Sequence, residues 1–155
     1  MAEKGIANAT VLAIIAEEDW APLGEVFAGS IWKLVCASTL FETQTASWRN
    51  PPGVVICDVR LSDGHSWKDL LHEIRQMEDP PPFIVADRLA NERLWAEALN
   101  LGAYDLLAKP FEVQEVWHAV TTACRRHEHQ NGVPRRPHAT ERPKDSGKRA
   151  VGTAW

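Results

Sequence analysis

Charged residues stand directly after three apolar segments of this sequence, at positions where the ends of neighbouring strands would bring them together. The acidic run Glu17-Glu18-Asp19 follows segment 11–16, Asp58 follows segment 54–57, and Lys109 follows segment 104–108. In an open parallel sheet, ligands bind outside the carboxyl ends of the strands, where the strand order reverses. If these segments are neighbouring strands, the carboxylates converge on one site that Lys109 can reach.

A cluster of carboxylates needs a cation, because like charges held close together repel one another. Carboxylate oxygens and water suit Mg²⁺, which proteins usually bind through one or two carboxylates and a phosphate. Aspartate can form an aspartyl-phosphate, and a metal ion and a lysine beside it would stabilise charge on the transferring oxygens. The three segments therefore favour phosphoryl transfer to Asp58.

The elements that must position these residues alternate between strand-like and helix-like patterns. The expected strands are 11–16, 31–36, 54–57, 83–86 and 104–108, and the expected helices run to Gly29 and over 40–49, 66–77, 91–101 and 111–127. Continuous apolar strands are typical of a parallel sheet that is covered on both faces. We predict a doubly wound five-stranded α/β fold of strand order 2-1-3-4-5, formed by residues 8–127.

The charge balance separates this body from the rest of the chain. Residues 1–124 hold 9 Lys and Arg against 18 Asp and Glu, a net charge of −9, whereas residues 125–155 hold 8 against 3, a net charge of +5. An acidic body argues against nucleic-acid binding through the folded surface. Residues 128–155 are polar, basic and rich in proline, and we predict a disordered tail.

The composition indicates where in the cell the protein is expected. No apolar run approaches the ~20 residues of a membrane span, and the N-terminal residues lack the pattern of a secretion signal. The three cysteines, Cys36, Cys57 and Cys124, form no closely spaced pair. This spacing argues against a disulfide framework or a zinc site and favours a reducing cytoplasm.

Three pieces of the sequence together resemble the receiver domains of response regulators, over residues 10–125. They are the acidic run after the first strand, Asp58 in Val54-Val-Ile-Cys-Asp-Val-Arg-Leu61, and the segment Gly102-Ala-Tyr-Asp-Leu-Leu-Ala-Lys-Pro-Phe111. The last piece is the most specific, because it sets a Gly-Ala helix end and Lys-Pro-Phe at a defined distance from Asp58. The resemblance implies a flavodoxin-like fold, Mg²⁺, phosphorylation of Asp58, and a cis bond before Pro110.

The resemblance also implies partners. A histidine kinase or a phosphotransfer protein would phosphorylate Asp58, and the domain would assist its own phosphorylation and dephosphorylation without acting as an enzyme on a separate substrate. The tail shows no helix-turn-helix pattern. We therefore expect a single-domain cytoplasmic response regulator whose output is a contact with a downstream protein.

The register of the first helix selects the metal-binding acids. In the family, core residues follow the second acid of the pair at about +4, +7 and +8. Counting from Asp19 gives Leu23, Val26 and Phe27, whereas counting from Glu18 gives the poorer set Pro22, Glu25 and Val26. By this resemblance the metal ligands are Glu18, Asp19 and Asp58, with Glu17 as a neighbour.

Three positions depart from the family pattern. Asp87 stands where a Ser or Thr hydroxyl would bond the phosphoryl group, and Leu106 stands where an aromatic residue would report the change. Ser62 replaces the usual proline in the loop after Asp58. The usual switch between hydroxyl and aromatic residue cannot operate here.

Other interpretations remain open. The departures at Asp87 and Leu106 favour a pseudo-receiver, an interaction module that has the fold but no phosphoryl chemistry. The acids could also serve only as helix or turn caps. An aspartyl phosphatase or a flavin protein on a similar sheet fits less well. The phosphatase would need a second acid two residues after Asp58, and Glu17-Glu18-Asp19 would repel a flavin phosphate.

Overall fold

The computed structural model describes residues 9–46 and 51–132. The strands are β1 (Thr10–Ile14), β2 (Lys33–Ala37), β3 (Val54–Asp58), β4 (Phe83–Asp87) and β5 (Asp105–Ala108). The helices are the short 3₁₀ turn η2 (Glu17–Asp19), α1 (Trp20–Phe27), α2 (Leu40–Ala46), α3 (Trp67–Ile74), α4 (Glu92–Leu101) and α5 (Val113–Gly132). Strands and helices alternate as the sequence predicts.

The five strands form one parallel sheet of order β2-β1-β3-β4-β5, which confirms the predicted fold class. All five residues of the central strand β3 are buried. The apolar sequence of this strand follows from its position, because helices cover both of its faces. The reversal of strand order lies between β1 and β3, as predicted.

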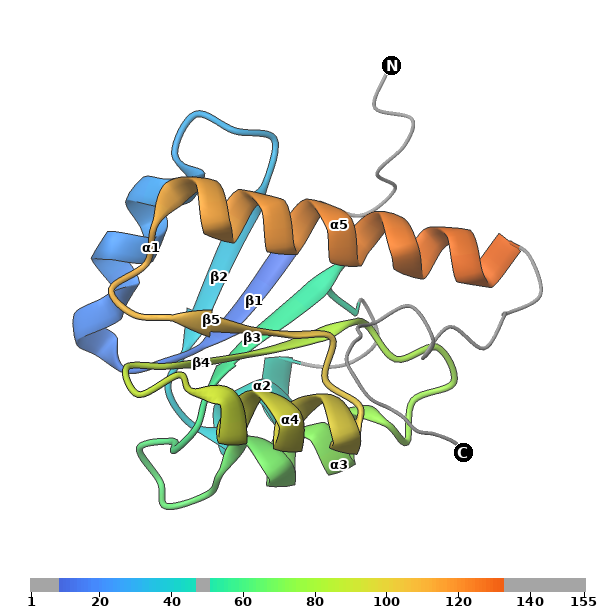
Figure 1. Ribbon diagram of the computed structural model, residues 1–155, viewed down its shortest axis with the longest axis horizontal. Coiled ribbons are helices and arrows are strands. Elements are labelled where there is room, and N and C mark those ends of the chain that lie inside the picture. Colours follow the sequence, from blue (N-terminus) through green and yellow to red (C-terminus); the bar gives the residue numbers. More distant parts are fainter. Residues whose placement is uncertain (1–8, 47–50, 133–155) are drawn as a thin grey trace.

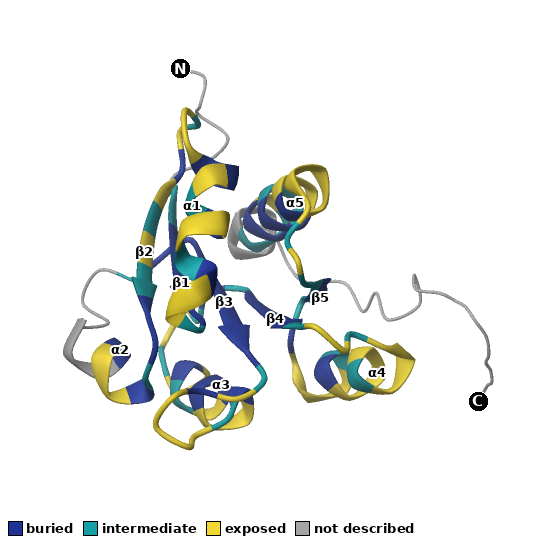
Figure 2. Ribbon diagram, turned by 90° about the vertical axis from the view of Figure 1, so that its left-hand side faces the viewer, coloured by how far each residue is buried: buried dark blue, intermediate teal, exposed yellow. Residues whose placement is uncertain are grey.

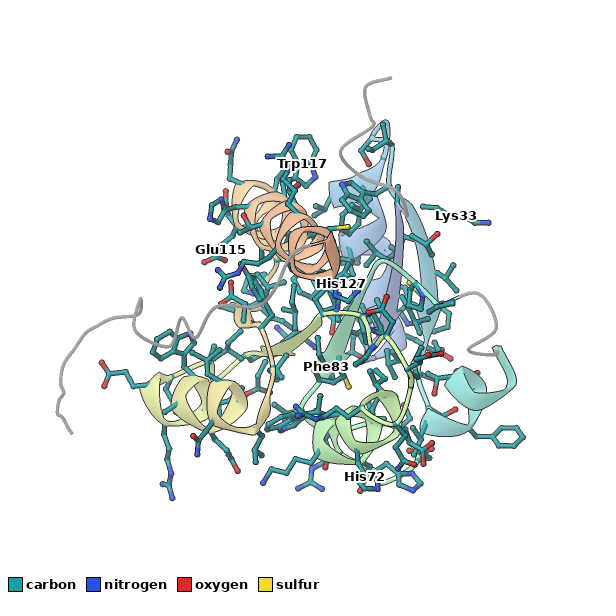
Figure 3. All side chains as sticks on the ribbon, turned by 90° about the vertical axis from the view of Figure 1, so that its right-hand side faces the viewer. Lys33, His72, Phe83, Glu115, Trp117 and His127 are labelled. Carbon is teal, nitrogen blue, oxygen red and sulfur yellow. The ribbon has the colours of Figure 1, made fainter. Side chains whose placement is uncertain are left out.

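Helices pack on the sheet in two layers (Figure 1), with α1 and α5 on one face and α2, α3 and α4 on the other. Buried residues face the sheet and exposed residues face outward on each helix (Figure 2). Phe83 of β4 packs in the core between the sheet and the layer of α2, α3 and α4, whereas Lys33, His72 and Glu115 point away from the body (Figure 3).

Local sequence signals explain the helix ends. Leu23, Val26 and Phe27 are the buried residues of α1, as the register predicts. The Asn91 side chain accepts a hydrogen bond from the Leu94 N–H at the start of α4, a cap that typically contributes about 1 kcal/mol. Gly102 ends α4 with a φ of 113°, a left-handed conformation that glycine adopts without a steric penalty.

The last helix corrects the sequence analysis. The predicted end of this helix was about residue 127, but α5 continues to Gly132. The segment 128–131 is polar, which suggested disorder, yet it contains no proline or glycine and can continue a helix. Gly132 is the last residue of this helix that the structure describes. The rest of the predicted tail, 133–155, lies outside the described residues.

The structure describes the second helix, α2, only as far as Ala46. The remainder of the predicted helix, 47–49, lies outside the described residues. Among the described helices, none combines the length and the apolar character that crossing a membrane would require. None of the three cysteines forms a disulfide, and Cys57 is fully buried.

Candidate functional site

Asp58 is the last residue of β3, and its carboxylate lies where β1 and β3 diverge. The strand register pairs Cys57 with Ile14, and the chain beyond β1 continues past the end of β3. The Ala16 N–H donates a hydrogen bond of 3.0 Å to Asp58 Oδ2 across 42 residues of sequence. This bond fixes one carboxylate oxygen and leaves the other, Oδ1, to face the rest of the site.

Lys109 joins the ends of all three predicted segments. Its Nζ lies 2.6 Å from Asp19 Oδ2 and 2.7 Å from Asp58 Oδ1. The Lys109 side chain is only 7% exposed, and those of Asp19 and Asp58 are each 10% exposed. The predicted convergence of Asp19, Asp58 and Lys109 is therefore present in the structure, with the ammonium between the two carboxylates.

The two carboxylates and the one ammonium influence each other's pKa. Burial raises the pKa of Asp58 above its ordinary value, and the charge of Asp19 adds to this rise. Lys109 and the Ala16 N–H act in the opposite direction, because they stabilise the ionised carboxylate. For Lys109, desolvation opposes the charge, but the bonds to Asp19 and Asp58 outweigh it and raise the pKa.

The site has carboxylate oxygens of the kind that bind a magnesium ion. Asp58 Oδ1 is buried, and it pairs with the Lys109 ammonium at 2.7 Å. Asp19 and Asp58 together supply two buried carboxylates, and Mg²⁺ is usually bound through one or two carboxylates with several waters. The residues present therefore fit this ion.

Glu18 does not join the other predicted ligands. The turn η2 directs Asp19 into the site, whereas Glu17 and Glu18 are exposed. Within residues 9–46 and 51–132, no three His, Cys, Asp or Glu side chains lie close enough together to hold a metal ion. Asp19 and Asp58 are thus the two predicted ligands that lie together, and a role of Glu18 in metal binding stays a prediction.

Asp87 ends β4 beside the site, but its side chain turns to its own loop. Its Oδ2 accepts a hydrogen bond of 3.0 Å from the Leu89 N–H. The backbone is in the predicted place, because the Asp87 carbonyl accepts a bond from the Lys109 N–H. The side chain of Arg88 enters the site from this loop, with Nη2 3.5 Å from Asp19 Oδ1.

Leu106 and Pro110 lie on either side of Lys109 in β5 and the segment that follows. Leu106 is partly buried and packs against the apolar cluster of the second layer, which includes Ala98 of α4. The position thus contributes packing and has no polar group with which to contact the site. The peptide bond between Lys109 and Pro110 is cis, as the resemblance predicts.

Ser62 has a structural reason for replacing proline. Its N–H donates a hydrogen bond of 3.1 Å to the Ser38 carbonyl, which links the loop after β3 to the loop after β2. Proline has no N–H and could not make this bond. The nearby Asp63 adds a second link, because its Oδ2 accepts from the Leu40 N–H.

Comparison with known proteins establishes the family. The model of the response regulator receiver domain matches residues 32–121, more than half of the chain. The protein belongs to the response regulator receiver family. This match begins at β2, so the placement of Asp19 rests on the geometry of the site and not on the family match.

Individual relatives agree with this assignment. The chain is 27% identical over 116 residues to the transcriptional regulatory protein DpiA of Escherichia coli strain K12, covering 71% of this chain and 51% of DpiA. It is 32% identical over 94 residues to the transcriptional regulatory protein FixJ of Bradyrhizobium diazoefficiens, covering 58% of this chain and 45% of FixJ. The chain thus spans about half the length of these curated relatives.

A solved structure supports the fold. A two-component response regulator from Clostridium difficile matches with a TM-score of 0.67 at 22% identity, covering 76% of this chain and 97% of that structure. At this level of identity the match supports the architecture alone. Together with the strand order above, this match completes the assignment of the fold.

Sequence reasoning missed two groups of the site. One is the Ala16 N–H, a backbone donor that no side-chain pattern reveals. The other is Arg88, whose position directly after β4 was the available signal, since charged residues at strand ends had identified Asp58 and Lys109.

Proposed function

We propose that this receiver domain accepts a phosphoryl group on Asp58 and signals through a protein partner. The observation that carries the proposal is the buried Lys109 ammonium within ion-pair distance of both Asp19 and Asp58. The donor would be a histidine kinase or a phosphotransfer protein, in the cytoplasm. Mg²⁺ would bind at Asp19 and Asp58 and would stabilise charge on the transferring phosphoryl oxygens.

The residues of the chain then have defined tasks in the transfer. The Ala16 N–H holds Asp58 Oδ2, and Oδ1 faces Lys109 and the rest of the site. Oδ1 would be the oxygen that attacks phosphorus. A bond forms between this oxygen and phosphorus, while the bond from phosphorus to the donor nitrogen breaks and the donor imidazole recovers its electron pair. Lys109 stabilises the developing negative charge.

Treatment with acetyl phosphate and Mg²⁺ tests this proposal. Intact-protein mass should rise by one phosphoryl group in wild type and in the control Asp63→Asn, which removes a carboxylate of the adjacent loop. The mass of Asp58→Asn should not change. Equal labelling of Asp58→Asn and wild type would contradict the assignment of Asp58 as phosphoacceptor.

A second function is favoured by the end of β4. Asp87 supplies no hydroxyl, its carboxylate bonds the Leu89 N–H, and Leu106 is packed apolar. These features suit a pseudo-receiver that binds its partner without phosphorylation. Beryllofluoride, a mimic of the acyl phosphate, discriminates between the functions. Binding in the presence of Mg²⁺ supports the phosphoacceptor, and absence of binding supports the interaction module.

A further inference from the structure

Arg88 changes the charge balance of the site. Asp19 and Asp58 carry two negative charges, and Lys109 and Arg88 carry two positive charges, so the four groups sum to zero. Each oxygen of the two carboxylates also faces a partner. Asp19 Oδ1 faces Arg88, Asp19 Oδ2 and Asp58 Oδ1 face Lys109, and Asp58 Oδ2 faces the Ala16 N–H. A divalent cation that binds these carboxylates therefore competes with these partners for the negative charge.

The contacts identify which partner gives way. Lys109 is buried and lies within 2.7 Å of two carboxylates, so its removal would leave buried charges uncompensated. Arg88 is 57% exposed and contacts Asp19 at the longer distance of 3.5 Å. Exposed pairs of this kind contribute little and are readily exchanged with solvent. Arg88 is the cation that a metal ion would displace from Asp19.

The displaced guanidinium would remain beside the phosphoacceptor. Arg88 contacts Asp19, and the Lys109 ammonium contacts both Asp19 and Asp58. Asp19 is therefore the only carboxylate between the arginine and the proposed site of phosphorylation. The turn of Asp87 toward the Leu89 N–H takes the neighbouring carboxylate away from this space. A guanidinium presents a planar set of donors that matches phosphate oxygens, and no hydroxyl is present at position 87 to donate instead.

From these contacts we propose, on the basis of the function proposed above, that Arg88 exchanges partners during phosphorylation. It neutralises Asp19 while metal is absent, yields this carboxylate to Mg²⁺, and then donates hydrogen bonds to the phosphoryl group on Asp58. In this role Arg88 supplies the hydrogen-bond donor that is lost at position 87.

Metal affinity tests the first half of the exchange. Mg²⁺ alone is titrated into the full chain by calorimetry, without any phosphoryl donor. Arg88→Ala should bind Mg²⁺ about fivefold more tightly than wild type, because the competing pair is gone. The control Arg93→Ala removes the same charge from the exposed face of α4 and should stay close to wild type. Equal affinities in Arg88→Ala and Arg93→Ala would overturn the proposal.

Beryllofluoride affinity at saturating Mg²⁺ tests the second half. Arg88→Ala should bind the mimic about tenfold more weakly than Arg93→Ala, through loss of a charge-assisted hydrogen bond. Arg88→Lys keeps the charge but loses the planar donor set. It should hold Mg²⁺ affinity near wild type and bind the mimic with intermediate affinity. Unchanged binding of the mimic in Arg88→Ala would overturn the proposal.

The two proposals can fail separately. If acetyl phosphate labels wild type while both affinities of Arg88→Ala match those of Arg93→Ala, the phosphoacceptor stands and the role of Arg88 is wrong. If wild type is neither labelled nor bound by beryllofluoride, the phosphoacceptor is wrong. The role of Arg88 then falls with it, because no phosphoryl group exists for it to meet.

Discussion

The two halves of the sheet edge differ in what they retain of the family pattern. The acceptor half of the edge lies beyond the ends of β1, β3 and β5. Its residues Asp19, Asp58 and Lys109 are buried, and the lysine lies within 2.7 Å of both carboxylates. The reporting half lies at the end of β4. There the Asp87 carboxylate accepts a hydrogen bond from the Leu89 N–H, and the exposed Arg88 contacts Asp19. The acceptor half holds the proposed phosphoacceptor and its lysine, whereas the reporting half has diverged from the family pattern and contributes Arg88.

Removing the shared cation should give the largest effect. In Lys109→Met, two buried carboxylates lose the ammonium between them, and we expect unfolding free energy to fall by about 3 kcal/mol. In Lys68→Met, which breaks the exposed pair with Glu97, the loss should stay below about 1 kcal/mol. Urea unfolding measures both. Similar losses would mean that the acceptor half gains nothing from burial.

Asp58→Asn should raise the free energy of unfolding, by less than Lys109→Met lowers it. Burial raises the pKa of Asp58 above its ordinary 3.8, so the folded protein binds more protons than the unfolded chain between these two values. The stability of wild type relative to Asp58→Asn therefore falls as pH rises from the ordinary value through the folded value, and then stays level. Asparagine keeps an oxygen for the Ala16 N–H.

Unfolding of the two proteins in urea across the acidic range measures this difference. The gap between Asp58→Asn and wild type should widen with rising pH. The gap between Asp63→Asn and wild type serves as the control, because the pKa of Asp63 is lowered and its contribution has the opposite sign. A gap for Asp58→Asn that narrows with rising pH would show that Lys109 outweighs burial at Asp58.

Asp87→Thr should have the smallest effect on stability, within about 0.5 kcal/mol, because the residue is only partly buried at the end of β4. Its effect on signalling should exceed its effect on folding. Restoring a hydroxyl beside the site should enlarge the amide NMR shifts that beryllofluoride causes in α4 and β5. Driving a two-state surface from mostly off to mostly on requires about 5 kcal/mol of differential interaction. Shifts in wild type that equal those in Asp87→Thr would show that position 87 is silent.

The buried parts of the molecule were the parts that sequence patterns could predict. Continuous apolar strands identified the parallel sheet, and the spacing from Asp19 to Leu23 selected the acid that enters the site. Both signals arise because burial restricts residue type at every position of an element. Glu18 is exposed, so burial does not restrict its residue type. Its assignment as a metal ligand rested only on its position directly before Asp19.

The loop after β4 was harder to predict because its geometry depends on hydrogen bonds. An aspartate that accepts from the N–H two residues later is a common turn, and Asp87 with Leu89 follows this pattern. The sequence therefore contained the signal for the Asp87 side chain turning away. The reach of Arg88 depends on that turn, which periodicity does not encode.

Parallel pairing of every strand also determines when the site can form during folding. No two neighbouring strands are joined by a hairpin, and the bond between Asp19 and Lys109 spans 90 residues. Such contacts form slowly, because a long loop must close before any of them contributes free energy. During synthesis the chain emerges from its N-terminus, so Asp58 is exposed long before Lys109 exists to pair with it. A nascent chain that stops before β5 has every acid of the site and lacks the lysine that neutralises them.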